Sequence, residues 1–261
     1  MKILFISRGK STEEISSIVK NQGESLVKQG MKVSFFPLVG QGFTGYLKSF
    51  FKLKKHLQNN KYDIFHAHYA LSAYVATLAF AQPLIVSLMG SDIYIGSFYN
   101  FITRFLITNM WNATIVKSSK MKQKININNV HVLPNGVDLT KFNLIEKKFA
   151  KAKVDFNSKK NVIFVSDPAN QVKNFALASK AVELLDNRVE LKVVNGVEHN
   201  LIPYYMNAAD VLVLTSFREG SPNVIKEAMA CNLPIVSTKV GDVKQVINNT
   251  EGCYITSFDH L

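Results

Sequence analysis

Short apolar runs and amphipathic segments alternate along the whole chain. The runs are mainly apolar along their length and are bounded by polar or glycine-containing turns. Continuous apolar runs of about four to eight residues are typical of parallel strands that are buried on both faces of a sheet. We expect such strands at 2–7, 31–38, 62–66, the first part of 83–92, 113–117, 130–134, 161–167, 189–194, 210–214, 233–237 and 252–256.

The segments between these runs carry apolar residues at helical spacing. We expect helices at 12–28, 46–60, 70–80, 98–110, 118–125, 175–185, 203–209 and 243–247, and one that begins close to Ser221. Alternation of strands and helices in two consecutive runs predicts the α/β class, with two doubly wound, Rossmann-like domains facing a cleft. We assign the first domain to residues 1–140, a polar linker to 141–160 and the second domain to 161–261. The second domain is expected to be incomplete, because no helix follows its final strand to cover it.

The most informative segment is 216–238, where a polar loop and then a helix follow an apolar run. Ser221 is expected to cap this helix, and Pro222 suits its first turn. Glu219 lies in the loop, and Glu227 lies inside the helix. Ligands of doubly wound sheets bind outside the carboxyl ends of the strands, and helix starts attract phosphates. The segment therefore suits a ligand with both phosphate and hydroxyl groups, and two solvated glutamates on an amphipathic helix are the alternative.

This segment resembles the Glu-x7-Glu element of the retaining, nucleotide-sugar-dependent glycosyltransferases of family 4, which have the GT-B fold. Other stretches are also similar to that family: His-Ala-His-Tyr at 66–69, Gly-Ser-Asp at 90–92 and Pro-Asn-Gly-Val-Asp at 134–138. Together the resemblances extend over nearly the whole chain. Met89 departs from the pattern, because the family often has a histidine before its Gly-Ser-Asp turn.

The resemblance implies roles for particular residues. Glu219, His68 and Lys173 are expected to be catalytic: Glu219 contacts the sugar hydroxyls, His68 faces the donor sugar and Lys173 balances the diphosphate charge. The family usually has an arginine shortly before this lysine, whereas residues 168–172 contain none, and an ordinary surface lysine is the alternative. Glu227 is expected to accept hydrogen bonds from ribose hydroxyls. The other expected donor-binding residues are Asn223, Val224, Ser221, Gly220, Gly9, Asn135 and Gly136, and the expected acceptor or cleft residues are Asp92 and Ser91.

The sequence gives no indication of a bound metal. His66 and His68 lie at the carboxyl end of an expected strand, but no third ligand with suitable spacing accompanies them. Without the resemblance, such a histidine either donates a hydrogen bond to a substrate or has a structural role. The chain contains no Asp-x-Asp sequence. We therefore expect fixed cations to balance the charge of the leaving group, with no metal and no cofactor.

The charge of the chain is unevenly distributed. The net charge is +12, and residues 1–150 contain 19 Lys and Arg against 7 Asp and Glu, whereas residues 151–261 contain 12 against 12. This excess predicts an anionic partner for the first half, either a membrane surface, a lipid phosphate or a nucleic acid, with a solvated lysine-rich surface as the alternative. The basic helix at 46–60 suits an anionic membrane interface or is an ordinary packed helix with snorkelling lysines. No recognition-helix or base-stacking sequence is present, so we expect no nucleic-acid partner.

The remaining sequence features indicate a cellular location. No apolar run reaches the roughly 18 residues that span a bilayer. The first residues become polar too soon for a signal peptide, and the two cysteines, Cys231 and Cys253, lack metal-site spacing. We therefore expect a cytoplasmic protein with peripheral contact at the inner face of the plasma membrane through its basic N-terminal half.

The motifs and the resemblance together predict a retaining hexosyltransferase. Its donor is expected to be a nucleotide-diphosphate sugar. Its acceptor is expected to be a saccharide or a membrane-associated, lipid-linked molecule, as in the synthesis of cell-surface polysaccharide or glycolipid. Two alternatives remain: a catalytically impaired donor-binding or partner subunit of the same fold, which the missing arginine favours, and a GT-B nucleotide-sugar epimerase.

Overall fold

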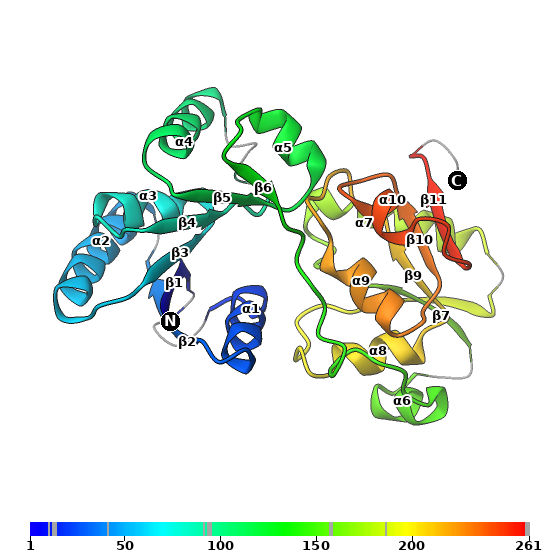
Figure 1. Cartoon of the computed structure of the whole chain (residues 1–261). Coiled ribbons are helices and arrows are strands. Elements are labelled where there is room, and N and C mark those ends of the chain that lie inside the picture. The colour runs from blue at the N-terminus through cyan, green and yellow to red at the C-terminus, as the bar shows by residue number, and fades with distance from the viewer. Residues whose placement is uncertain are drawn as a thin grey trace. The chain divides into compact units, whose positions relative to one another are not determined.

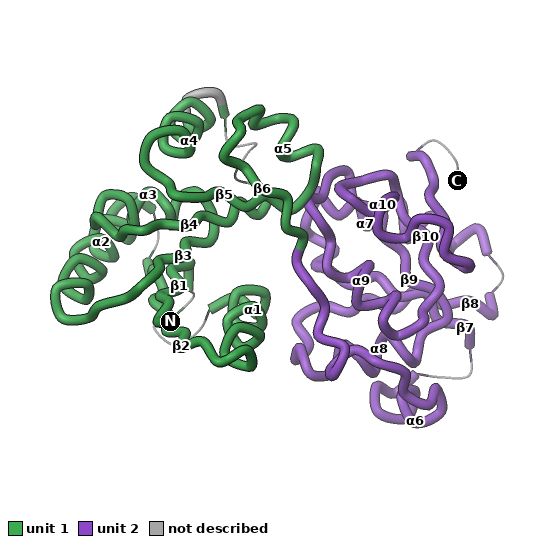
Figure 2. The backbone as a smooth tube through the Cα atoms, in the orientation of Figure 1, with its two compact units in different colours: residues 1–134 green, residues 135–261 purple. Residues whose placement is uncertain are grey.

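The chain forms two compact units, Met1–Pro134 and Asn135–Leu261 (Figure 2). The computed structural model describes residues 1–9, 11, 15–40, 42–90, 92, 96–156, 159–185 and 187–258. Within these residues, each unit contains one parallel sheet whose strands alternate with helices, as the sequence predicts. None of the helices described is long and apolar enough to cross a membrane.

The division between the units differs from the expected one. The segment 141–160, predicted to be a linker, belongs entirely to the second unit. It contains helix α6 (Lys147–Lys153), which buries Ala150 and packs against α8 (Ile202–Ala208). The prediction was wrong because this short helix is mostly lysine and buries too few residues to give a visible apolar period.

In the first unit, the strands described lie in the order β2-β1-β3-β4-β5-β6 and are all parallel. Phe5 on strand β1 lies opposite Phe35 on one side and His66 on the other. The chain therefore changes direction across the sheet at β1, and ligands of such sheets bind at this kind of switch point. The strands are β1 (Lys2–Arg8), β2 (Lys32–Leu38), β3 (Ile64–His68), β4 (Leu84–Ser87), β5 (Ala113–Val116) and β6 (Val130–Val132).

The helices of the first unit divide between the two faces of its sheet. Helix α1 covers one face, and α2, α3, α4 and α5 cover the other (Figure 1). This division follows from right-handed crossover connections on either side of β1. The helices are α1 (Ser17–Lys28), α2 (Gly42–Asn59), α3 (Ala70–Leu78), α4 (Ser97–Asn109) and α5 (Ser119–Ile125).

Helix α2 begins earlier than predicted. The expected helix starts at Tyr46 after a glycine-rich loop, whereas the observed helix starts at Gly42. The glycines serve a close approach of two backbone segments: a Cβ atom added to Gly45 would lie 2.5 Å from the carbonyl carbon of Gly40. Glycine at these positions therefore reflects packing of the helix start rather than a flexible loop.

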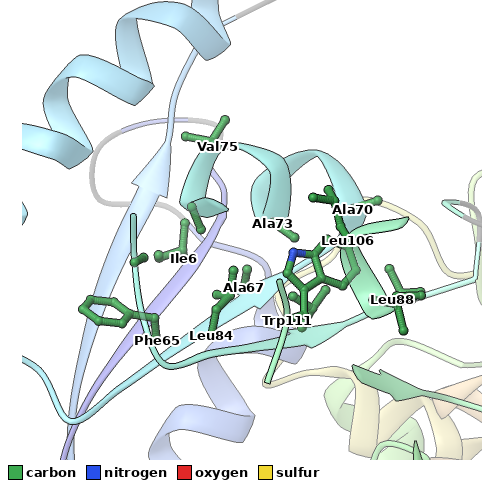
Figure 3. Packing of buried hydrophobic residues seen from close by; sticks show 14 of the residues in the cluster. Ile6, Phe65, Ala67, Ala70, Ala73, Val75, Leu84, Leu88, Leu106 and Trp111 are labelled. Atoms are coloured by element: carbon green, nitrogen blue, oxygen red, sulfur yellow. The ribbon is translucent and has the colours of Figure 1, made fainter. Parts of the chain in front are cut away.

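The core of the first unit lies between α3 and the central strands (Figure 3). Ala70 and Ala73 on α3 are small, which lets the helix approach the sheet closely. Trp111 is buried in the same cluster, and its indole N–H donates to the hydroxyl of Thr77 at 2.9 Å. This bond satisfies the polar group of the largest side chain in the core.

In the second unit, the strands described lie in the order β11-β10-β9-β7-β8. Strand β7 lies between β8 and β9, so this sheet has its switch point at the carboxyl ends of β7 and β9. The strands are β7 (Lys160–Phe164), β8 (Val189–Val193), β9 (Val211–Leu214), β10 (Ile235–Thr238) and β11 (Cys253–Thr256). The helices besides α6 and α8 are the 3-10 turn η2 (Gln171–Lys173), α7 (Phe175–Glu183), α9 (Asn223–Ala230) and α10 (Val243–Ile247).

Candidate active site

A lysine and a glutamate form an ion pair at the switch point of the second sheet. Lys173 ends the turn η2 after β7, and Glu219 lies in the loop between β9 and α9. The Lys173 Nζ atom lies 2.7 Å from Glu219 Oε1, and the hydroxyl of Ser216 donates to the same oxygen at 2.7 Å. Both side chains are partly buried. The structure thus brings together two of the three residues predicted to be catalytic.

The two loops that carry this pair are held to one another. The Thr215 hydroxyl lies 2.9 Å from the carbonyl oxygens of both Lys173 and Asn174. The backbone N–H of Phe217 donates to the carbonyl of Val172 at 2.9 Å. These bonds fix the backbone on either side of the ion pair, so the two charged groups are placed before any ligand arrives.

The start of α9 lies next along the same loop. Its N-cap residue is Pro222, which makes no side-chain capping hydrogen bond to the first turn. The first backbone N–H groups of a helix have no intrahelical partners and carry a partial positive charge. The prediction that Ser221 caps this helix was wrong, because its hydroxyl donates to Asp242 Oδ2 at 2.6 Å. Asn223 begins the helix, and its buried side-chain oxygen has no partner within the described structure.

A second lysine joins three segments around this helix start. The Lys226 ammonium donates to the Ser221 hydroxyl at 2.6 Å and to the carbonyl of Asn135 at 2.8 Å. Burial lowers the pKa of Lys226, and the nearby Asp242 carboxylate partly opposes this effect. Sequence reasoning did not identify Lys226 and Asp242. A lysine among the polar positions of an amphipathic helix gives no sign that other loops hold its ammonium group.

Three predicted donor-binding residues have backbone or packing positions in this region. The Gly220 carbonyl approaches Gly241 so closely that a Cβ atom there would lie 2.7 Å from its oxygen. Gly136 has open space on its Cα, with no heavy atom within 4 Å of an added Cβ. Val224 packs against the hydrophobic core of the second unit. Gly136 therefore leaves room for a ligand close to its backbone, whereas Gly220 is packed against Gly241 and Val224 contributes to the core.

Glu227 lies in the second turn of α9 and is largely buried. Burial raises the pKa of Glu227 to about 7, because the charged carboxylate loses solvation there. Within the described structure, no side chain or backbone N–H donates to this carboxylate. It is therefore an acceptor that gains hydrogen bonds if a ligand with hydroxyl groups binds against it.

The first unit contains a pair of buried histidines. The rings of His66 and His68 stack at 4.3 Å between centroids, and Phe5 lies 4.9 Å from each ring. His66 Nε2 and the Ser87 hydroxyl share a hydrogen bond at 2.9 Å, whereas neither ring nitrogen of His68 has a partner among the described residues. Burial and the Lys117 ammonium lower the pKa of His66 to about 3. Burial first, then His66 and Lys117, hold the pKa of His68 well below its usual value, so both rings are neutral near pH 7.

Asp92 organises the turn that follows β4. Its carboxylate accepts from the backbone N–H groups of Met89, Gly90 and Ala70. Burial raises the pKa of Asp92, and these backbone hydrogen bonds oppose that rise. The carboxylate is thus used to connect the turn to the start of α3. Ser91, the other predicted acceptor or cleft residue, lies outside the described residues.

Gly9 lies directly after β1 in the first unit. Its backbone N–H donates to the carbonyl of Leu38 at 3.1 Å, and it forms an isolated bridge with Ile15. These contacts give Gly9 a defined backbone position at the carboxyl end of β1.

The chain matches proteins of known families over most of its length. A family model described as Glycosyltransferase Family 4 matches residues 16–141, and one described as Glycosyl transferases group 1 matches residues 161–260. The chain is 25% identical over 224 residues to TuaC of Bacillus subtilis, a glycosyltransferase assigned to teichuronic acid biosynthesis. The match covers 74% of this chain and 58% of that relative, so the chain spans less than two thirds of its length.

Solved structures show the same fold. Sucrose-phosphate synthase of Thermosynechococcus elongatus superposes with a TM-score of 0.75 at 17% identity, covering 99% of this chain and 86% of that one. HepE of Anabaena, solved in complex with UDP and glucose, superposes with a TM-score of 0.74 at 17% identity, covering 98% and 86%. At this identity the likeness is one of fold.

Proposed function

Since the chain belongs to the family 4 glycosyltransferases of the GT-B fold, we propose that it transfers a hexosyl unit from a nucleotide-diphosphate sugar to an acceptor with retention at the anomeric carbon. The relative from Bacillus subtilis supports a role in making a cell-surface polysaccharide. The acceptor is accordingly a growing saccharide or a membrane-associated, lipid-linked glycan.

The observation that carries this proposal is the ion pair of Lys173 and Glu219 at the switch point of the second sheet. A diphosphate binds at the Lys173 ammonium and the uncapped start of α9, where two sources of positive charge are available. Once the ammonium pairs with the diphosphate, Glu219 accepts hydrogen bonds from the hydroxyl groups of the sugar. The pair therefore keeps both groups in place while the site is empty.

Glu227 extends this site to the nucleoside. Its buried carboxylate lacks donors among the described residues and is only partly ionised near neutral pH, since its pKa is about 7. Two ribose hydroxyls supply the missing hydrogen bonds and favour the ionised form. This assignment makes nucleotide binding release a proton at neutral pH, which gives a test that does not depend on turnover.

In the reaction, the bond between the anomeric carbon and the diphosphate breaks, and a bond to an acceptor hydroxyl forms on the same face of the sugar. The acceptor hydroxyl passes its proton to an oxygen of the departing diphosphate, which leaves with the electron pair of the broken bond. Lys173 and the start of α9 stabilise the charge that grows on this leaving group, and they do so without a metal. We assign His68 to hydrogen bonding with substrate, because its imidazole is neutral and its ring nitrogens have no partners in the residues described.

The proposal is tested by incubating the chain with a panel of UDP-, GDP- and ADP-sugars and measuring nucleotide release, with and without a membrane lipid extract as acceptor. Release from one donor class that increases with acceptor supports a transferase. Nuclear magnetic resonance of the product then shows whether the anomeric configuration is retained. Conversion of the donor into another nucleotide sugar without release contradicts it in favour of an epimerase.

A second candidate function is a donor-binding partner subunit without turnover. The observation that favours it is the absence of arginine from residues 168–172, directly before Lys173. Saturable binding of a donor with no release, in both the presence and absence of acceptor, identifies this case.

A further inference from the structure

Helix α2 has two apolar sides, and only one of them packs against the protein. Phe50, Leu53 and Leu57 face the core of the first unit. Phe43, Leu47 and Phe51, spaced four residues apart, form a second line along the helix that we call the α2 outer stripe. Their side chains are 81%, 45% and 61% exposed, which is unusual for a continuous line of large apolar residues.

Lysines accompany the α2 outer stripe. Lys48 directly follows Leu47, Lys52 directly follows Phe51, and Lys55 lies about one turn beyond Phe51; all three are exposed. Lys54 lies over the ring of Phe50 at 6.0 Å. The helix contains no aspartate or glutamate. No ion pair of these four lysines occurs within the described structure, so no acidic side chain of the described residues neutralises their charges.

The combination of aromatic and lysine side chains selects one kind of partner. Protein–protein interfaces are depleted in lysine, because its ammonium group is costly to desolvate. An anionic lipid surface instead accepts both groups, with phenylalanine in the acyl boundary and the ammonium groups at the phosphates. We propose that the α2 outer stripe inserts into the surface of an anionic membrane and that the lysines beside it bind lipid phosphates.

Two further features of the first unit support membrane binding by the α2 outer stripe. Phe101 and Phe105 form a second exposed line on α4, at 71% and 55% exposure, and α4 covers the same face of the sheet as α2 (Figure 1). Residues 1–134 contain 16 Lys and Arg against 5 Asp and Glu, whereas residues 135–261 contain 15 against 14. The basic excess therefore belongs to the unit that exposes the aromatic lines.

The inference goes beyond the proposed reaction, because binding to lipid requires no donor and no turnover. The experiment is co-sedimentation of the full chain with vesicles of phosphatidylcholine alone and with vesicles that also contain phosphatidylglycerol. We expect binding only to the anionic vesicles, and we expect it to weaken as salt is raised, because salt screens charge attraction at a surface.

Paired variants separate the α2 outer stripe from net charge. Lys52→Glu with Lys55→Glu is expected to weaken binding about 25-fold or more, since each lysine near an anionic surface contributes about a five-fold factor. Phe43→Ser with Phe51→Ser is expected to weaken it about ten-fold or more. The matched controls lie on α6, which is also basic: Lys148→Glu with Lys153→Glu, and Phe149→Ser, all at exposed positions. They are expected to keep binding within about two-fold of the parent chain.

A fluorescent reporter places the contact directly. Phe51→Trp is expected to show a blue shift and quenching by brominated lipid on anionic vesicles, whereas Phe149→Trp is expected to show neither. The native Trp111 is buried and gives a constant background. Absence of binding to anionic vesicles overturns the proposal, as does equal loss of binding in the α2 and α6 variants. Concentration-dependent self-association that the Phe43→Ser and Phe51→Ser pair abolishes, without vesicle binding, also overturns it and identifies a second copy as the partner.

Discussion

At the scale of single residues, the chemistry proposed for this chain depends on three charged side chains of the second unit. Lys173 and Glu219 form an ion pair within a network that includes Ser216, and Glu227 lies buried in α9 with a pKa raised to about 7. Lys173 and Glu219 are positioned to contact the diphosphate and the sugar. Glu227 is expected to lose its proton when ligand hydroxyl groups bind to its carboxylate. Each role gives a separate test.

Replacing Glu219 is expected to affect turnover more than donor binding. Glu219→Gln removes the charge that Lys173 balances and weakens the contact with sugar hydroxyls, so we expect nucleotide release to fall about 100-fold or more. The measurement is the rate of release at saturating donor, with Glu251→Gln on the exposed surface as the control. Parent-like rates in Glu219→Gln, once its folding is verified by circular dichroism, contradict the assigned role.

Glu227 predicts a pH dependence of both stability and binding. Its folded pKa of about 7 lies above the ordinary value of 4.5, so the folded state holds a proton that the unfolded state has lost between these values. The stability of the second unit should therefore fall by about 1.4 kcal/mol per pH unit as pH rises through this range. Glu227→Gln removes this penalty and should leave the protein about 3 kcal/mol more stable than the parent at pH 8 and equal to it near pH 4.5.

Donor binding should show the opposite dependence, because the ribose hydroxyls favour the ionised carboxylate. We expect the affinity for nucleotide to rise up to about ten-fold per pH unit below pH 7 and to level off above it. Calorimetry in buffers of different ionisation enthalpy measures the released proton. A flat affinity profile in the parent chain, identical to that of Glu227→Gln, excludes this role.

At the scale of elements, hydrogen bonds between loops position the start of α9. Lys226 connects Ser221 and the segment at Asn135, and Ser221 continues the connection to Asp242 before α10. The helix start that the proposal assigns to a diphosphate is thus fixed by a lysine whose ammonium group bonds to two other segments. Lys226 is a positioning residue in this account.

Lys226→Met is expected to destabilise the second unit by about 2 kcal/mol, since it removes hydrogen bonds from a charged donor and leaves Asp242 with one fewer neighbouring charge. Donor affinity should fall as well, because the helix start loses its support. Thermal unfolding measures the first effect, and Lys244→Met on the exposed side of α10 should change stability by no more than about 0.5 kcal/mol. Equal melting temperatures of Lys226→Met and Lys244→Met would show that the hydrogen bonds of Lys226 contribute nothing to stability.

The elements also show what the sequence can and cannot predict. Buried strands such as β9 were predicted because a continuous apolar run has few other stable environments. Helix α6 was not predicted, because it buries almost only Ala150. The early start of α2 was not predicted either, because it depends on contact between Gly40 and Gly45. The pairing of Lys173 with Glu219 was likewise not visible, since 46 residues separate them and only the strand order brings their loops together.

At the scale of the whole molecule, the two units are expected to respond to pH in opposite directions. Burial depresses the pKa of His66 to about 3 and that of His68 well below its usual value of 6.5. Below pH 6.5 the unfolded state therefore binds protons that the folded first unit excludes, and this unit should lose about 1.4 kcal/mol per pH unit for each histidine as pH falls. The second unit gains stability over the same range through Glu227.

Trp111 allows this contrast to be measured, because it is the one tryptophan in the sequence and lies in the core of the first unit. Urea unfolding followed by tryptophan fluorescence should show a lower midpoint at pH 5 than at pH 7.5. Hydrogen exchange of peptides from α9, compared with the intrinsic exchange rate at each pH, should show greater protection at pH 5 than at pH 7.5. Midpoints that do not move with pH contradict the neutral, buried state of the histidine pair.

Turnover by this chain is expected to need no divalent metal. Lys173 and the start of α9 supply the positive charge at the leaving group, so a chelator such as EDTA should leave nucleotide release within about two-fold of its initial rate. Loss of release with EDTA, restored by magnesium or manganese, contradicts this feature of the mechanism.

The central claim is that the second unit binds a nucleotide-diphosphate sugar where Lys173 and Glu219 meet. The most direct test is calorimetric titration of the best donor from the panel into the parent chain, Lys173→Ala and Lys180→Ala, the last being an exposed lysine on the neighbouring helix α7. We expect binding about ten- to a hundred-fold weaker for Lys173→Ala and unchanged binding for Lys180→Ala, because only the first removes a charge-assisted contact to the diphosphate. Equal affinity in all three proteins would contradict the claim.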